Sequence, residues 1–209
     1  MAIRRFSGSS LTTGSKSSKL WDQETSLGTF ESIATATSSG SDASITFSGI
    51  PQNYTHLQIR GNVQTNRATY GSDALFLRVG NGTIDTGANY SWHNLYGCNS
   101  TAAANGSASA TSNYILNSGC VGTSTGGSFG AIIVDLLDYT SVNKNKTIRV
   151  VGGTDDNANT GGFGNGVGIN SSSWFPSTPV AITTVLIAPL FGSLFTAYTT
   201  FSLYGIRGA

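Results

Sequence analysis

Charged residues are scarce in this chain, whose 209 residues include 11 Lys and Arg and 10 Asp and Glu. Soluble domains commonly carry about a quarter charged residues, more than twice this share. Helices place Lys, Glu and Arg on their solvent-facing sides, so this composition offers little material for exposed helices. The same scarcity leaves few acids, bases and metal ligands, and it argues against an enzyme and against a bound cofactor.

Histidines, cysteines and long apolar runs are also few. His56 and His93 are the only histidines and no further ligands stand at suitable spacing, so no metal centre is expected. Cys98 and Cys120 are expected as free thiols because the site of synthesis is reducing, with a disulfide between them as the open alternative. The longest apolar stretch, 185–191, is interrupted by a proline and too short to span a membrane.

Charge and the start of the chain indicate where the protein is made and what it does not bind. The net charge of +1 gives no general attraction to nucleic acid or to an anionic membrane surface. Residues 1–8 lack the apolar core of a signal peptide, so we expect synthesis in the cytoplasm.

Short runs of β-branched, aromatic and aliphatic residues separated by turn residues predict strands from residue 29 onward. Residues 54–63 alternate strictly, with Leu57, Ile59 and Val63 on one face, which is typical of a half-buried strand. Residues 129–139 are the most apolar run and predict a central strand buried on both faces.

Eight to ten strands are expected over residues 29–209, in an antiparallel, jelly-roll-like β-sandwich. Residues 29–37 and 43–47 predict a hairpin, since a Ser/Gly-rich turn separates them. Residues 97–128 indicate a long loop or a loose edge hairpin, and residues 152–168 a glycine-rich loop.

The first 28 residues differ from the rest because they are basic, rich in serine and without periodicity. We interpret them as an extended N-terminal arm that orders on a partner, and a floppy tail remains the alternative. The residues expected to dock this arm on its partner are its cations and its isolated apolar side chains: Arg4, Arg5, Phe6, Lys16, Lys19, Leu20 and Trp21.

Three short motifs resemble known catalytic or binding sequences. Residues 122–126 have the form of a nucleophile elbow but lack a following helix and a later histidine. Residues 155–161 resemble the start of a calcium loop, yet Thr and Gly replace its sixth and twelfth residues, so a solvated turn is favoured over a cation site. Residues 161–168 do not fit the dinucleotide fingerprint in any register.

Two acids on the apolar run complete the survey of catalytic candidates. Asp135 and Asp138 are three residues apart and therefore face opposite sides of a strand, which is unsuitable for glycoside hydrolysis. We expect Asp138 in a turn, and Asp135 beside Arg149 of a neighbouring strand.

An aromatic segment around residue 93 is the remaining candidate for binding. Tyr90, Trp92 and Tyr96 fall on one side of a predicted strand, with His93 among them. Such a cluster serves as a sugar-binding platform in some proteins, but more often packs in a core or between subunits. These four residues are therefore candidate glycan or subunit contacts.

Several runs share their order and spacing with a known family: 30–35, 54–61, 65–71, 129–131 with 135–139, and 202–206. In these runs the chain resembles virion structural proteins of tailed bacteriophages, especially marine and cyanobacterial phages. The resemblance covers residues 30–206 and implies a non-enzymatic component of the particle. It carries over no catalytic or ligand residue.

Resemblance and composition together lead to one expectation and one alternative. The expectation is a capsid decoration (cement) protein of the virion. It would form a homotrimer and dock by its arm on the major capsid protein or another virion protein. The alternative is a tail-fibre or receptor-binding adhesin that recognises host surface glycan through Trp92, Tyr90 and the loops 97–128 and 152–168. An enzyme such as a glycan depolymerase is the least favoured class.

Overall fold

The computed structural model describes residues 29–68, 71–98, 101–122, 127–155 and 165–208, with the backbone alone for 116–122. Within these ranges the chain is all-β and contains no helix. The described residues form thirteen strands, more than the eight to ten expected. They are β1 (Phe30–Thr37), β2 (Ile45–Phe47), β3 (His56–Thr65), β4 (Asp73–Asn81), β5 (Thr83–Ile84), β6 (Tyr90–Cys98), β7 (Thr101–Ala110), β8 (Asn113–Gly122), β9 (Gly130–Leu137), β10 (Lys146–Thr154), β11 (Gly166–Trp174), β12 (Thr184–Pro189) and β13 (Thr200–Ile206).

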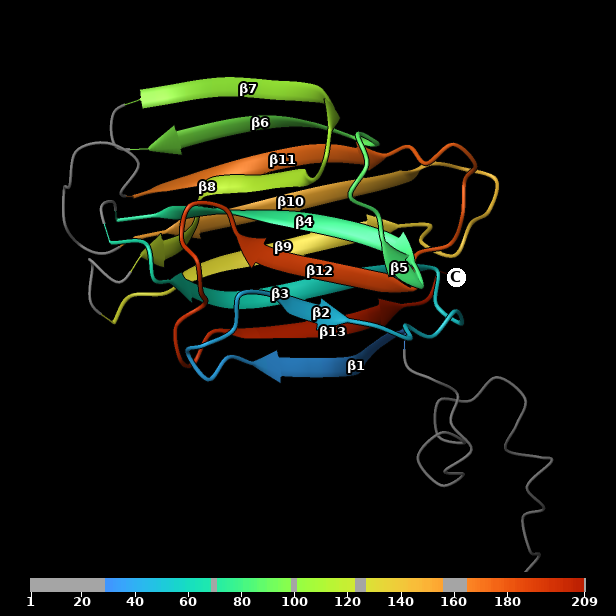
Figure 1. The fold of residues 1–209 in the computed structure, drawn as a ribbon, viewed down its shortest axis with the longest axis horizontal. Coiled ribbons are helices and arrows are strands. Elements are labelled where there is room, and N and C mark those ends of the chain that lie inside the picture. Colours follow the sequence, from blue (N-terminus) through green and yellow to red (C-terminus); the bar gives the residue numbers. More distant parts are fainter. Residues whose placement is uncertain (1–28, 69–70, 99–100, 123–126, 156–164, 209) are drawn as a thin grey trace, which may run out of the picture.

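Two antiparallel sheets pack against each other, which confirms the predicted β-sandwich (Figure 1). The large sheet has eight strands in the order β1-β13-β3-β9-β10-β11-β6-β7. The small sheet has the order β2-β12-β4-β8, and β5 pairs with the end of β4. The chain crosses repeatedly from one sheet to the other, in the manner of a jelly roll. A short parallel pairing of β3 with β8 joins the two sheets.

The predicted hairpin between residues 29–37 and 43–47 is wrong. Both segments are strands, but β1 pairs with β13 in the large sheet and β2 pairs with β12 in the small one. Each therefore takes its partner from the last quarter of the chain. Local turn residues indicated a reversal correctly, and they could not indicate that the two strands separate into different sheets.

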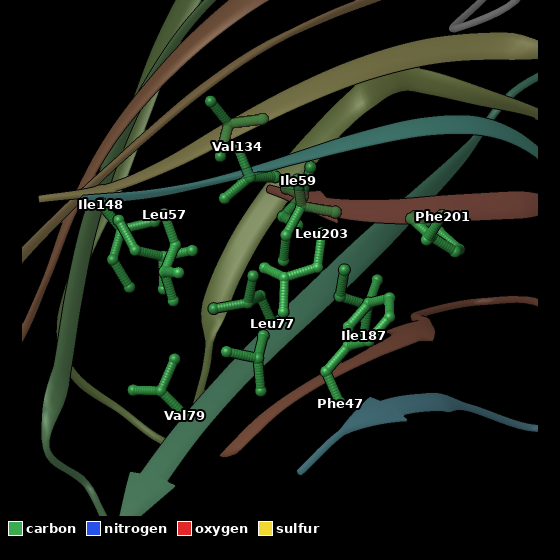
Figure 2. Close-up of a cluster of buried hydrophobic side chains, with 14 of the residues drawn as sticks. Phe47, Leu57, Ile59, Leu77, Val79, Val134, Ile148, Ile187, Phe201 and Leu203 are labelled. Atoms are coloured by element: carbon green, nitrogen blue, oxygen red, sulfur yellow. The ribbon is translucent and has the colours of Figure 1, made fainter. Parts of the chain in front are cut away.

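The core lies between the sheets and is built by the inward half of each alternating strand. Leu57, Ile59 and Val63 of β3 are fully buried, as predicted from their spacing. Leu57 and Ile59 face Leu77 and Val79 of β4 across the interior (Figure 2), and Val63 belongs to the same buried cluster. Full burial of one such side chain contributes about 1.5–3 kcal/mol, so this layer supplies most of the driving force for folding.

Strand β9 corrects the expectation of a strand buried on both faces. Ile132, Val134 and Leu136 point into the core, whereas Ile133 on the other side is 40% exposed. The strand is central in the large sheet, between β3 and β10. No second layer covers the outer side of this sheet among the described residues, so its apolar outward residues face solvent.

Two segments rich in turn residues are largely strands. For residues 97–128 the alternatives were a long loop and a loose edge hairpin, and the structure shows the hairpin. Residues 97–128 contain β7, which forms an edge hairpin with β6, and β8, which belongs to the small sheet. The glycine-rich segment 152–168 supplies the end of β10 and the start of β11, which pair with each other. Its middle, with most of the candidate cation turn 155–161, lies outside the described residues.

A network of hydrogen bonds fixes the turn before β6. The carboxylate of Asp85 accepts bonds from Trp174 Nε1 (2.7 Å), Asn89 Nδ2 (2.8 Å) and the backbone N–H of Gly87 (2.8 Å). Burial by itself raises the pKa of Asp85, but these three donors outweigh it and hold that pKa below its ordinary value of 3.8. The charged carboxylate therefore stabilises this end of the sandwich.

Candidate functional site: the outer face of the large sheet

The aromatic residues of β6 do not form an exposed platform. Tyr90 is 1% exposed, and its hydroxyl donates to the carbonyl of Asp85 (2.8 Å) and accepts from the N–H of Val79 (3.1 Å). Burial raises the pKa of this hydroxyl. Trp92 stacks on Tyr114 of β8, with ring centroids 4.9 Å apart, and so packs between the sheets. Tyr90 is therefore wrong as a glycan or subunit contact.

The other two members of the predicted cluster lie on opposite sides of β6. Tyr96 is half-buried on the inward side, like Trp92. His93 is exposed on the outer side, directly opposite Gly106 of β7 and Ser171 of β11. Alternation along the strand separates His93 from the aromatic rings, so the structure does not bring the four residues together.

The predicted arm lies outside the described residues, as residues 1–28 are not among them, and its docking role stays a prediction. Cys98 is buried as a free thiol at the end of β6. The side chain of its candidate partner, Cys120, falls in the segment described by its backbone alone.

A row of aliphatic side chains crosses the outer face of the large sheet. Ile133 of β9 lies opposite Val151 of β10, Val151 opposite Ile169 of β11, and Ile169 opposite Leu95 of β6. The last three are 49%, 55% and 60% exposed. We call these four residues the aliphatic ridge. A solvated sheet face normally carries polar residues, so this continuous apolar row is unusual.

A second row runs beside the aliphatic ridge, two residues further along each strand, where the next side chain also points outward. It consists of small residues and a single valine. It runs through Ala131, Gly153, Val167, Gly97 and Ala102, which are neighbours on β9, β10, β11, β6 and β7. The first four line a shallow depression of about 590 Å³, which Asp155 and Asn165 also border. We call this row the hollow. Ridge and hollow lie side by side on β9, β10, β11 and β6, and the hollow continues onto β7.

Elsewhere the same outer face carries hydroxyl, charged and aromatic side chains. Thr35 bonds Ser202 (2.9 Å), and Thr37 bonds Thr200 (3.1 Å), across β1 and β13. The guanidinium of Arg60 on β3 lies over the rings of Phe30 and Tyr204, 5.1 Å and 5.6 Å from their centroids. The exposed aliphatic side chains of this face therefore gather in the half of the sheet between β9 and β7.

Within the described residues the carboxylates do not converge on a catalytic site. Asp135 lies opposite Arg149, as expected, and accepts a hydrogen bond from Gln58 (2.8 Å). Asp138 sits in a turn with φ of +48°, as predicted, and pairs with Lys144 (2.6 Å). Lys144 donates to this carboxylate and holds the pKa of Asp138 below its usual value.

The described residues contain neither a candidate metal cluster nor a candidate membrane-spanning helix. No group of three or more His, Cys, Asp or Glu side chains is arranged to hold a metal ion. No described helix is long and apolar enough to cross a membrane.

Comparison with known proteins yields no relative: no family model, no curated protein and no solved structure matches the chain. The candidate site therefore stands on geometry alone.

Sequence reasoning missed the ridge, although a signal for it was present. Residues 129–139 and the pair Val150-Val151 are apolar at successive positions, so both faces of β9 and β10 carry apolar side chains. For the first of these runs, residues 129–139, the pattern predicted burial on both sides within one chain. The structure shows that one of those sides is the outside of the molecule.

Proposed function

We propose that this chain is a non-enzymatic structural subunit of a bacteriophage virion, most specifically a capsid decoration (cement) protein. It docks on the particle by residues 1–28 and associates with further copies of itself through the sandwich. The resemblance of five runs to phage virion proteins supports the particle role. The observation that carries self-association is the uncovered aliphatic ridge on a sandwich that otherwise carries little charge.

The alternative of a glycan-binding adhesin loses its main support. Its aromatic residues Tyr90 and Trp92 pack inside the sandwich instead of lining a surface groove. Sugar recognition relies on exposed aromatic faces flanked by hydrogen-bonding groups, and the outer face offers aliphatic side chains there instead.

A particle-binding assay tests the arm. Full-length protein and a variant lacking residues 2–28 are mixed with virus particles stripped of this protein, and bound protein is measured after sedimentation. We expect the truncated protein to remain a β-rich folded domain by circular dichroism and to lose attachment. A full-length Leu20→Ser/Trp21→Ser variant provides the matched control for the apolar anchors, and it should bind more weakly than the parent protein.

Copy number separates the two positions on the particle. Quantitative mass spectrometry of purified virions should give hundreds of copies for a decoration protein and about a dozen for a tail protein, because capsid and tail differ in symmetry. Full attachment by the truncated protein, or a tail-like copy number, contradicts the proposal.

A further inference from the structure

We propose that two copies of this chain pack face to face through the ridge and the hollow, about a two-fold axis that runs between these two rows. This inference rests on the proposed function only for the idea of self-association. Its geometry comes from the register of the five strands β9, β10, β11, β6 and β7.

The two rows are complementary to themselves. A two-fold axis parallel to the rows places the ridge of one copy over the hollow of the other, strand by strand. Leu95 then lies over Gly97 of the second copy, and Val151 over its Gly153, because each pair is two residues apart on one strand. Large side chains therefore meet positions that have no side chain, and the sheets can approach closely.

The same operation brings Ile133 over Ala131 and leaves one pair in which both residues are large. Ile169 of each copy meets Val167 of the other. Both residues belong to β11, the middle of the five strands, so the bulkiest contact falls at the centre of the interface. Central, fully desolvated contacts carry most of the energy of protein interfaces.

Charges at the rim also match. Arg149 lies one outward position beyond the ridge on β10, and Asp155 follows the end of the same strand beyond the hollow. The two-fold operation places Arg149 of each copy over Asp155 of the other, giving two symmetric pairs of opposite charge. Ser171 and Asn165 come together in the same way on β11. A surface that carries both members of each pair fits a second copy of itself.

The area suffices for a stable pair. Five strands at a spacing of about 4.8 Å and four rows about 6.8 Å apart cover about 600 Å² of each copy. About 1,200 Å² in total lies at the lower end of the range for specific interfaces. Specific interfaces near this size have dissociation constants from micromolar downward, so the dimer should form at micromolar concentrations of the protein.

Face-to-face pairing also accounts for the pattern of β9 and β10, which are apolar on both sides. One side packs on the small sheet of its own chain, and the other packs on the large sheet of the second copy. The four-layer assembly buries both.

The test measures the oligomeric state of the full-length protein by sedimentation equilibrium up to about 100 µM, well above the expected dissociation constant. We expect a dimer for the parent chain. Ile169→Asp should raise the dissociation constant about 100-fold or more, because each copy then buries a charge at the centre. Val142→Asp is the matched control, since Val142 is 60% exposed in the turn between β9 and β10, away from the ridge.

A charge exchange tests the geometry itself. Arg149→Asp and Asp155→Arg should each weaken the dimer about 10-fold, and the double variant should restore it, because opposite charges then face each other again. Gly97→Leu should also weaken the dimer, since it fills the hollow; a Cβ at Gly97 meets nothing nearer than 3.9 Å in its own chain. Thermal unfolding of each variant monitors its fold.

A monomeric parent protein, a trimer, or a dimer that Ile169→Asp leaves intact would overturn the inference. So would failure of the double charge variant to recover while each single variant is weakened. A monomeric protein would also contradict the self-association in the proposed function. The virion role itself is decided separately, by the particle-binding assay and the copy number. A dimeric protein absent from virions would instead refute the proposed function and leave the pairing in place.

Discussion

Replacing Asp73 tests how the end of β3, the start of β4 and the turn after β12 are held together. This carboxylate is fully buried at the start of β4, and four hydrogen-bond donors surround it. They are Thr65 Oγ1 (2.8 Å) and the backbone N–H groups of Ala74 (2.8 Å), Phe191 (3.2 Å) and Gly192 (2.9 Å). Arg67 Nη1 lies 3.7 Å away and supplies the compensating charge. One side chain thus joins β3, β4 and the turn after β12.

The magnitude of the effect follows from what Asp73→Ala leaves behind. Removing one partner from a buried, hydrogen-bonded ion pair costs about 3–5 kcal/mol, because the remaining groups lose their partners without regaining water. For a domain of this size that corresponds to a fall in Tm of roughly 6–20 °C. Asp73→Asn keeps the volume and one acceptor oxygen, but its amide N–H₂ faces donors, so a loss of about 2 kcal/mol is expected.

Urea unfolding followed by tryptophan fluorescence measures these free energies of unfolding. Asp135→Asn is the matched control, because Asp135 is half-exposed on β9 and accepts one side-chain bond, from Gln58. Its substitution should cost less than about 1 kcal/mol. If Asp73→Ala proves no more destabilising than Asp135→Asn, the carboxylate does not anchor the three segments and the reasoning is refuted.

Three further predictions concern other parts of the fold. Tyr90→Phe should lower the free energy of unfolding by about 1–3 kcal/mol, because it removes a hydrogen bond from buried backbone groups. Tyr198 is 78% exposed, so Tyr198→Phe should leave the free energy of unfolding unchanged in the same denaturation assay. Because the pKa of Asp85 is lower in the folded state than its ordinary value of 3.8, this carboxylate contributes fully to stability above pH 3.8, and the contribution is lost as the pH falls through the folded-state pKa. Asp85→Asn should therefore flatten this part of the plot of unfolding free energy against pH. An unchanged plot would contradict the role given to Asp85. Gly205→Ala should destabilise the fold by about 1–3 kcal/mol, because a Cβ there would lie 2.4 Å from the ring of Tyr54. Gly97→Ala has free space within its own chain and should be neutral when both variants are compared at a concentration at which the protein is monomeric. Equal Tm values for the two variants would refute this account of the packing.

The sequence located most strands and their inward faces correctly. Leu57, Ile59 and Val63 could be assigned to the core because side chains alternate along any strand, and this period is local. The turn position of Asp138 and the facing of Asp135 and Arg149 were also foreseen, and the structure confirms both. The buried anchor Asp73 went unnoticed, since its partners Phe191 and Gly192 lie more than a hundred residues away.

Composition and alternation by themselves determined that this chain is an all-β sandwich with little charge, because a strand's period is written in consecutive residues. Only the tertiary structure decided which strands pair, for example β1 with β13, and which apolar faces are covered by another layer. An apolar residue such as Ile133 indicates that one side of a strand is shielded from water. The strands that pair with it and the layer that covers it come from distant segments or from another molecule. The ridge became recognisable only once the sheets were assembled, because its four side chains come from strands spread over residues 90–174.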